Sequence, residues 1–219
     1  MLPIRVDEIA KEKCPQLKLG CLQCDVSIRD DYPELLEMID KEIQNIRSKI
    51  QIENISKIST ISSARRAYKA AGKDPARYRL SAESLLRRVV KGNNLYKINN
   101  VVDLLNLVSI QSGISIGGYD VSKIEGIATF GIGKENEPYE GIGRGVLNIE
   151  NMPVFRDNMG AFGSPTSDSS RTMVTQQTKS FLMVFFGFGG LDLLNESLDL
   201  ATNYLTQFVH ATNFERKVI

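Results

Sequence analysis

The chain has 219 residues, of which 42% are hydrophobic and 24% charged, and its formal net charge at pH 7 is +1. These values are typical of one packed globular domain and exclude a disordered, collagen-like or coiled-coil chain. The longest apolar run, 181–188, is far shorter than the roughly 20 residues that a membrane-spanning helix needs. The first residues include Asp7 and Glu8 and form no apolar signal core, so we expect a cytoplasmic protein.

The first half of the sequence predicts one strand followed by four helices. Alternating and branched residues favour the strand, and apolar residues three or four apart favour the helices. Ser81 and Asn100 are placed as N-caps, while Gly72, Gly92 and Gly113 are placed as helix ends. The expected elements are a strand over 21–28 and helices over 33–48, 55–71, 81–91 and 101–112.

The second half is rich in glycine and in short branched runs, which predict strands joined by turns. The expected strands are 114–116, 126–130, 145–149, 152–155 and 181–186, and a closing amphipathic helix follows from Leu194 to Phe208. Helices precede strands without regular alternation, so we expect an α+β fold, a single domain over 1–219 with helices on a mixed or antiparallel sheet. The run 181–186 has no polar face and should be a buried strand.

The usual catalytic and metal-binding patterns are weak. The only histidine, His210, is near the C-terminus, and we expect a partly exposed helix residue rather than a catalytic base. Cys21 and Cys24 are three apart on a predicted strand, so their thiols should point to opposite faces and not share a metal. The three cysteines of the chain are consistent with reduced thiols. No metal or cofactor is expected.

Two glycine-rich stretches come close to nucleotide-binding motifs without matching them. Residues 128–135 nearly match a phosphate-binding loop, and residues 141–145 nearly match a dinucleotide-binding motif. Both are better explained as turns.

One charged segment departs from the neutral average. Ten Lys or Arg residues and only Asp74 and Glu83 lie between Arg65 and Lys97, a local charge of +8 in a chain whose total is +1. Three tyrosines are interleaved with these cations. The segment is either a phosphate-binding face, with aromatic rings that stack on unpaired bases, or a pair of solvated helices. The predicted RNA-binding residues are Lys73, Arg77, Arg79, Arg87, Arg88 and Lys91.

Several segments together resemble a known module. They are GKDPARYRLSAESLLRRVVKG, NLYKINNVVDLLNLVSIQSGISIGGYDVSKIEG, EPYEGIGRG and GAFGSPTSDSSRT, which lie between residues 72 and 172, and the resemblance extends over about 60–190. These segments resemble the tRNA-editing module of the phenylalanyl-tRNA synthetase β subunit, and more closely the free-standing bacterial proteins made of that module alone. The resemblance implies an α+β fold, tRNA as the partner, and hydrolysis of a wrongly attached amino acid.

The residues of the family's editing site carry over only in part. Asn106 matches the family's Asn on a helix, but Leu105 stands in place of the preceding Thr. The family's His falls on Gly117, and its late-strand Glu, which resembles a sensor for the tyrosine hydroxyl, falls near Val184. The Ala-Gly wall of the pocket corresponds to 163–164. The resemblance therefore implies that the pocket scaffold is kept while its tyrosine-specific polar groups are replaced.

A polar loop follows this wall and supplies the predicted site. Asn106 is expected to bond the substrate's amino acid or ribose, the loop hydroxyls to position water or the ester carbonyl, and Asp168 to bind the substrate ammonium. The predicted catalytic residues are Asn106, Ser164, Thr166, Ser167 and Asp168, and the predicted substrate-binding residues are Gly163, Asp157, Arg171 and Thr172. The alternative is a solvent-exposed Ser/Thr turn.

The preferred hypothesis is a free-standing tRNA-binding module that hydrolyses a misacylated tRNA in trans. An ester is already activated, so positioned water can suffice without a histidine. The first alternative is a non-catalytic protein that binds tRNA or a small amino-acid-like ligand. An unrelated metabolic enzyme on the same scaffold is the third hypothesis.

Overall fold

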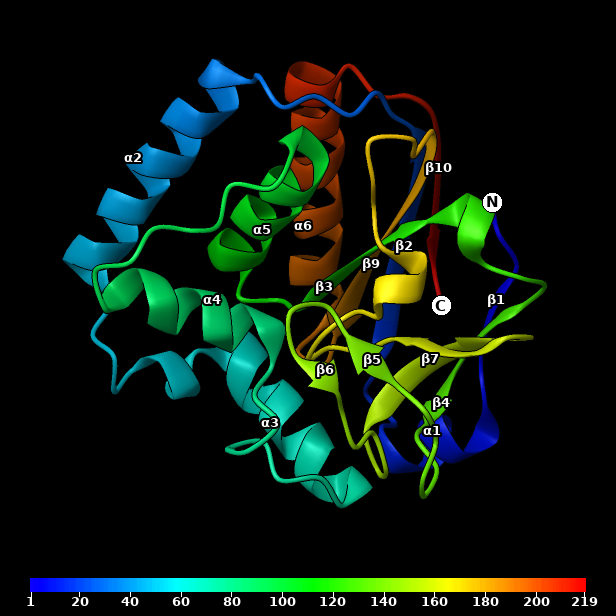
Figure 1. Ribbon diagram of the computed structural model, residues 1–219. Coiled ribbons are helices and arrows are strands. Elements are labelled where there is room, and N and C mark those ends of the chain that lie inside the picture. The colour runs from blue at the N-terminus through cyan, green and yellow to red at the C-terminus, as the bar shows by residue number, and fades with distance from the viewer.

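The computed structural model describes residues 1–219 and contains a helical layer and two four-stranded sheets (Figure 1). The middle sheet is antiparallel, in the order β10-β2-β9-β3, and the outer sheet is mixed, in the order β1-β4-β7-β8. This confirms the α+β class. The helices are α1 (Glu8–Lys13), α2 (Pro33–Lys49), α3 (Ser59–Ala71), α4 (Ser81–Val90), α5 (Asn100–Ser112) and α6 (Leu191–Tyr204). The strands are β1 (Ile4–Val6), β2 (Lys18–Asp25), β3 (Ile116–Asp120), β4 (Ala128–Ile132), β5 (Glu140–Gly141), β6 (Gly145–Val146), β7 (Pro153–Asp157), β8 (Gly160–Gly163), β9 (Ser180–Gly187) and β10 (Thr212–Val218).

Strand β9 lies at the centre of the molecule and is buried on both faces, as the apolar run predicts. It pairs with β2 on one side and β3 on the other. Phe181, Met183 and Phe185 join the core under the helices, whereas the alternate residues join the core between the sheets. The middle sheet therefore separates two hydrophobic cores, and every side chain of this run has an apolar partner layer.

The helices cover one face of the middle sheet with the stripes that the sequence predicts. In α2 the buried residues are Leu35, Ile39, Ile43 and Ile46, spaced three or four apart. Helix α6 packs against α5 and the middle sheet, then ends in a π-helical turn over Leu205–Val209. Gly72 and Gly113 close their helices in the left-handed conformation, as expected.

Both predicted N-caps are wrong by one residue. The cap of α5 is Asn99, whose side chain accepts from the N–H groups of Val101 and Val102. Asn100 is the first helical residue, and its amide bonds the 27–29 loop instead. The residue before α4 is Leu80, which offers no side-chain cap. Tertiary contacts decide these ends, since the N–H of Ser81 donates to the carbonyl of Pro165.

Several strand predictions are shifted or missing. The predicted strand 114–116 is replaced by β3, which starts at Ile116, and only Gly145–Val146 of the predicted strand 145–149 pairs. Strands β1, β8 and β10 and helix α1 were not expected from the sequence. Each of the three strands lies at a sheet edge, and β10 is mostly exposed and polar, so none carries a strong apolar alternation.

The two cysteines of the C-x-x-C pattern lie on opposite faces of β2, as expected from their spacing. Cys24 belongs to the core under the helices and Cys21 to the core between the sheets. Burial raises the pKa of each thiol to about 12. The two sulfurs therefore do not converge on one metal ion. None of the helices has the length and hydropathy to span a bilayer.

Candidate functional site

The candidate site is centred on Tyr119, at the edge of the middle sheet. Its ring packs edge-on against Phe162, with centroids 5.1 Å apart, so it fills the space between the two sheets. Two glycines make room for it: a Cβ atom at Gly117 would lie 2.0 Å from the Tyr119 oxygen, and one at Gly163 would lie 2.2 Å from it. The position where the resemblance places a histidine is thus closed by the hydroxyl of Tyr119.

Asp168 meets the same strand from the loop after β8. Its Oδ2 atom accepts the backbone N–H of Gly118 at 3.1 Å. Its Oδ1 atom is buried and has no hydrogen-bond partner, and the same is true of the Tyr119 hydroxyl. The two side chains are neighbours, although the pair lacks the geometry of a hydrogen bond. Two orphaned polar atoms side by side in a core are unusual, because each forgoes its bonds to water.

The chemistry of this pair follows from its burial. Burial raises the pKa of Asp168 to about 7, although the hydrogen bond from the Gly118 N–H opposes the shift. Burial and the nearby Asp168 carboxylate raise the pKa of Tyr119 well above 10, so its hydroxyl stays protonated. A carboxyl group with a pKa near neutrality can both take and return a proton at physiological pH. Perturbed groups of this kind are enriched at functional sites.

The hydroxyl groups of the predicted loop are mostly bound within the protein. The Ser164 oxygen accepts the N–H groups of Thr166 and Ser167 and donates to the Ser167 carbonyl at 2.9 Å. The Thr166 hydroxyl lies 2.9 Å from the Tyr68 hydroxyl, and Thr166 is only 2% exposed to solvent. In this conformation both hydroxyls shape the loop, and their expected contact with a substrate stays a prediction. Ser167 is half-buried and donates to the Asp168 carbonyl.

A surface groove of about 480 Å³ borders this loop. It lies between the β5–β6 hairpin, β8 and the short helix Ser170–Thr172, and its lining includes Tyr139, Val146, Met159, Ser169 and Arg171. The hairpin is bound to the loop, because the Ile142 N–H donates to the Asp168 carbonyl at 2.9 Å. The hairpin that borders the groove is thus bonded to the backbone of Asp168, the residue that carries the buried carboxyl.

Of the predicted substrate-binding residues, Arg171 lines the groove, but its inner N–H groups already bond Asp157. The two guanidinium nitrogens lie 2.8 and 3.1 Å from the Asp157 carboxylate oxygens. This bidentate pair fixes the short helix to the end of β7. Thr172 is fully buried in this conformation, and its expected contact with a substrate stays a prediction. Gly163 acts by accommodating Tyr119.

Asn106 lies on α5 and is half-buried. Its neighbour Leu105 is the residue that packs against the sheet, since a Cβ atom at Gly118 would lie 2.6 Å from its Cδ1 atom. Gly118 also donates to Asp168, so α5 and the loop approach the same point of β3. The assignment of Asn106 to the substrate stays a prediction.

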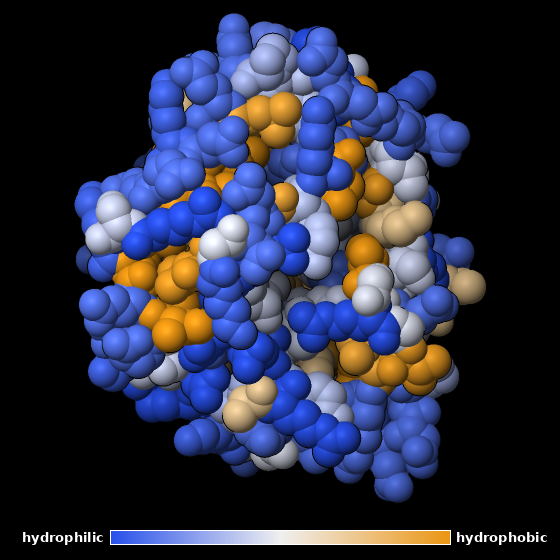
Figure 2. All heavy atoms as spheres, turned by 60° about the vertical axis from the view of Figure 1, so that its left-hand side comes forward, coloured by the Kyte–Doolittle hydropathy of each residue, from blue (hydrophilic) through white to orange (hydrophobic).

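The predicted basic face is divided by the fold. It belongs to the side turned forward in Figure 2, where hydrophilic residues surround a shallow hollow. Lys73 is 7% exposed, and its ammonium donates to the carbonyls of Asn148 and Glu150, so in this conformation its donors are directed to the protein rather than to solvent. Arg79 and Arg87 lie beside the buried carboxylate of Glu83. Arg88 stacks on Tyr96, whereas Arg77 and Lys91 are exposed.

These features can be compared with known proteins. Residues 63–217 match the family model described as the B3/4 domain. The chain belongs to the B3/4 domain family. Its fold is similar to that of an N-terminal fragment of the phenylalanyl-tRNA synthetase β subunit from Pyrococcus horikoshii, with a TM-score of 0.52 and 14% identity. The match covers 99% of this chain and 50% of that fragment, so the chain spans half the length of the solved structure. No curated protein matches the sequence at a significant level.

The B3/4 match confirms the module that the sequence resembles, and the solved structure confirms its fold. Tyr119 was not predicted as a site residue. The pair Gly117-Gly118 in front of it is the feature of the sequence that could have identified it, because consecutive glycines in a strand indicate a close approach by another group.

Proposed function

We propose that this B3/4 domain binds tRNA and hydrolyses the ester bond of a misacylated tRNA in trans. The observation that carries the proposal is the buried Asp168 carboxyl, with an unpartnered oxygen and a pKa of about 7, beside the Tyr119 hydroxyl. This pair stands at the position where the resemblance implies a histidine. It supplies a group of the same proton affinity as that histidine.

In the proposed reaction, the Asp168 carboxylate takes a proton from a water molecule as the water oxygen attacks the ester carbonyl. The carbonyl–ribose bond then breaks, and the proton passes from Asp168 to the departing ribose oxygen. The protonated Tyr119 hydroxyl stabilises the negative charge that develops on the carbonyl oxygen. Oriented donors of this kind are typically worth about 10²–10³ in rate.

The carboxyl oxygen is enclosed, so water and substrate must reach it by a movement of the chain. The β5–β6 hairpin is the segment that covers this side, through the contact of Ile142 with Asp168. Its turn contains Gly143 and Gly145 at positive φ, and Val146 in it is 89% exposed. A short, weakly packed hairpin of this kind is suited to open and close over a site. The exposed cations Arg77 and Lys91, together with the half-buried Arg88 that stacks on Tyr96, would contact the tRNA backbone.

The test is deacylation measured across a panel of misacylated tRNAs with the wild type, Asp168→Asn and Tyr119→Phe. Both substitutions keep the shape of the side chain and should lower the rate about 10²-fold, since each removes one proton-bearing group. Asp103→Asn is the matched control. Asp103 is also a buried carboxylate beside a tyrosine, Tyr32, at 2.8 Å, but in the helical core. The control should lose stability and keep its deacylation rate.

Full activity of Asp168→Asn would refute the assignment of the reaction to this pair. One structural feature favours the alternative of binding without hydrolysis: the Ser164 and Thr166 hydroxyls, expected to position water, are bound inside the protein. A wild-type protein that binds tRNA but leaves every member of the panel intact would establish that alternative.

A further inference from the structure

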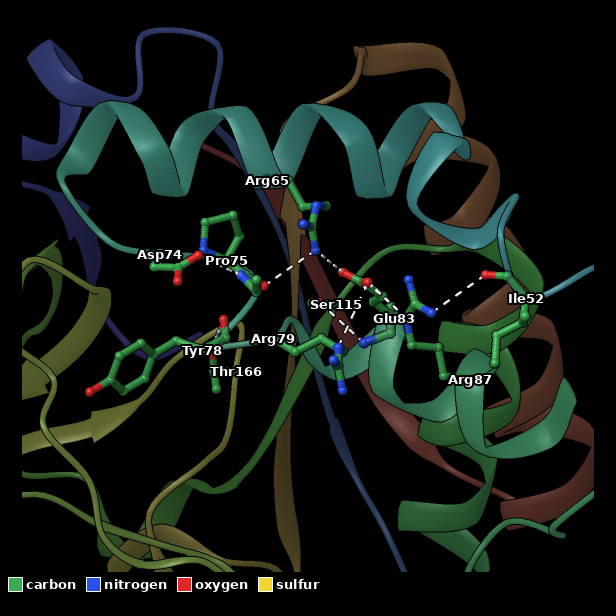
Figure 3. A network of polar contacts seen from close by, with 12 residues as sticks. Ile52, Arg65, Asp74, Pro75, Tyr78, Arg79, Glu83, Arg87, Ser115 and Thr166 are labelled. Carbon is green, nitrogen blue, oxygen red and sulfur yellow. Dashed lines mark hydrogen bonds and ion pairs between the residues drawn. The ribbon is translucent and has the colours of Figure 1, made fainter. Parts of the chain in front are cut away.

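Three arginines surround one buried carboxylate on the helical side of the molecule. Glu83 lies in the first turn of α4, and its side chain is 1% exposed. Arg65 from α3 donates to one oxygen at 2.8 Å, and Arg87 from the next turn of α4 donates to the other at 2.9 Å. Figure 3 shows these two side chains and Arg79 directed toward Glu83 from different sides.

The cluster carries more positive charge than it needs for its own stability. The three guanidinium groups carry one positive charge each, and Glu83 is the only acid that pairs with any of them. The surplus is therefore two positive charges. Burying an unbalanced charge is costly unless it is partly solvated or meets an anion.

Arg79 is the arginine whose donors remain available. Its Nε atom lies 3.8 Å from the nearer Glu83 oxygen, too far for a hydrogen bond, and it is buried without a partner. Its side chain is nevertheless 43% exposed, compared with 23% for Arg65 and 25% for Arg87. The guanidinium of Arg79 is thus partly exposed to solvent. It lies beside Arg65 and Arg87, which Glu83 holds in place.

We propose that Arg79, with Arg65 and Arg87, forms a subsite for an RNA backbone phosphate, and that Glu83 positions Arg65 and Arg87 beside Arg79. The proposal rests on the tRNA binding proposed above, and it names where one phosphate is held. A guanidinium matches phosphate oxygens with two parallel N–H bonds, and a surplus of positive charge favours a phosphate over a neutral ligand. Arginines already ordered by Glu83 lose less side-chain entropy on binding than free ones.

The experiment measures binding of a fluorescein-labelled, uncharged tRNA over a range of KCl concentrations. Arg79→Gln should lower the affinity about tenfold and reduce the slope of log K against log salt by about 0.7–0.9, the contribution of one phosphate. Arg79→Lys should keep the slope, since the charge remains. It should lower the affinity, because an ammonium group cannot form two parallel N–H bonds with a phosphate. Arg79 forms no hydrogen bond with Glu83, so both variants should fold, which circular dichroism checks.

Arg66→Gln is the matched control. Arg66 is exposed on α3 one residue after Arg65, carries the same charge, and bonds only the Ser62 and Ser63 hydroxyls. Equal losses for Arg66→Gln and Arg79→Gln would show a diffuse electrostatic field and overturn the subsite. Direct binding of inorganic phosphate or AMP without any binding of tRNA would also overturn it, in favour of a small-molecule site. A wild type that binds no tRNA would refute the proposed function itself, whereas tRNA binding indifferent to Arg79 would refute only this inference.

Discussion

The stability of the protein should depend on pH through Asp168, and the variant Asp168→Asn isolates this dependence. The pKa of the carboxyl is 3.8 in a free aspartate and about 7 in the fold, because burial disfavours its charge. Between these values the unfolded chain releases the proton while the folded chain keeps it. The contribution of the Asp168 carboxyl to the free energy of unfolding is therefore fully present below about pH 4. It decreases as the pH rises and is lost above about pH 7.

The size of the effect follows from the difference between the two pKa values. About three pH units, at about 1.4 kcal/mol each, give at most about 4 kcal/mol. An asparagine does not ionise in this range. The free energy of unfolding of Asp168→Asn, relative to the wild type, should therefore increase by up to that amount between pH 4.5 and pH 7.5.

Urea unfolding followed by circular dichroism measures this difference, since the chain contains no tryptophan for fluorescence. Asp157→Asn is the control with the opposite sign. Burial raises the pKa of Asp157, but bonds from the Glu125 N–H and from Arg171 outweigh it and lower the pKa. The loss of unfolding free energy caused by Asp157→Asn should be constant between pH 4.5 and pH 7.5 and should diminish only below about pH 4. A constant difference between Asp168→Asn and the wild type would refute the burial argument.

Three further outcomes are expected. Gly117→Ala should cost about 1–3 kcal/mol, because its Cβ atom would lie 2.0 Å from the Tyr119 oxygen. Tyr119→Phe in the same chain should recover part of this loss, whereas Gly189→Ala, with no contact nearer than 3.5 Å, should change urea stability little. Lys73→Met should lose about 1–3 kcal/mol, because two carbonyls of the 148–150 turn lose their donor, while the salt dependence of tRNA binding stays unchanged. The three cysteines, all buried, should react with a thiol reagent only after urea unfolds the protein, and rapid labelling of the native chain would contradict their positions.

The sequence by itself determined the class of the fold and its family. The run 181–186 has no polar face, so it had to be a strand buried on both sides, and β9 is that strand. The apolar stripe of α2 and the glycines at 72 and 113 fixed helices close to their observed bounds. The four segments between residues 72 and 172 that resemble the family were enough to indicate the B3/4 module. All of these features depend on residues that are near one another in the chain.

Only the tertiary structure decided which polar residues are free to act. The Lys73 ammonium donates to carbonyls 75 and 77 positions away, and Arg65 pairs with a carboxylate 18 positions away. No local pattern encodes such pairings. The Asp168 carboxyl has its pKa raised because β3 and the loop after β8 enclose it, although its position in a Ser/Thr-rich stretch suggests an exposed turn. Charge and spacing are properties of the sequence, whereas desolvation is a property of the packed molecule, and the proposed chemistry depends on desolvation.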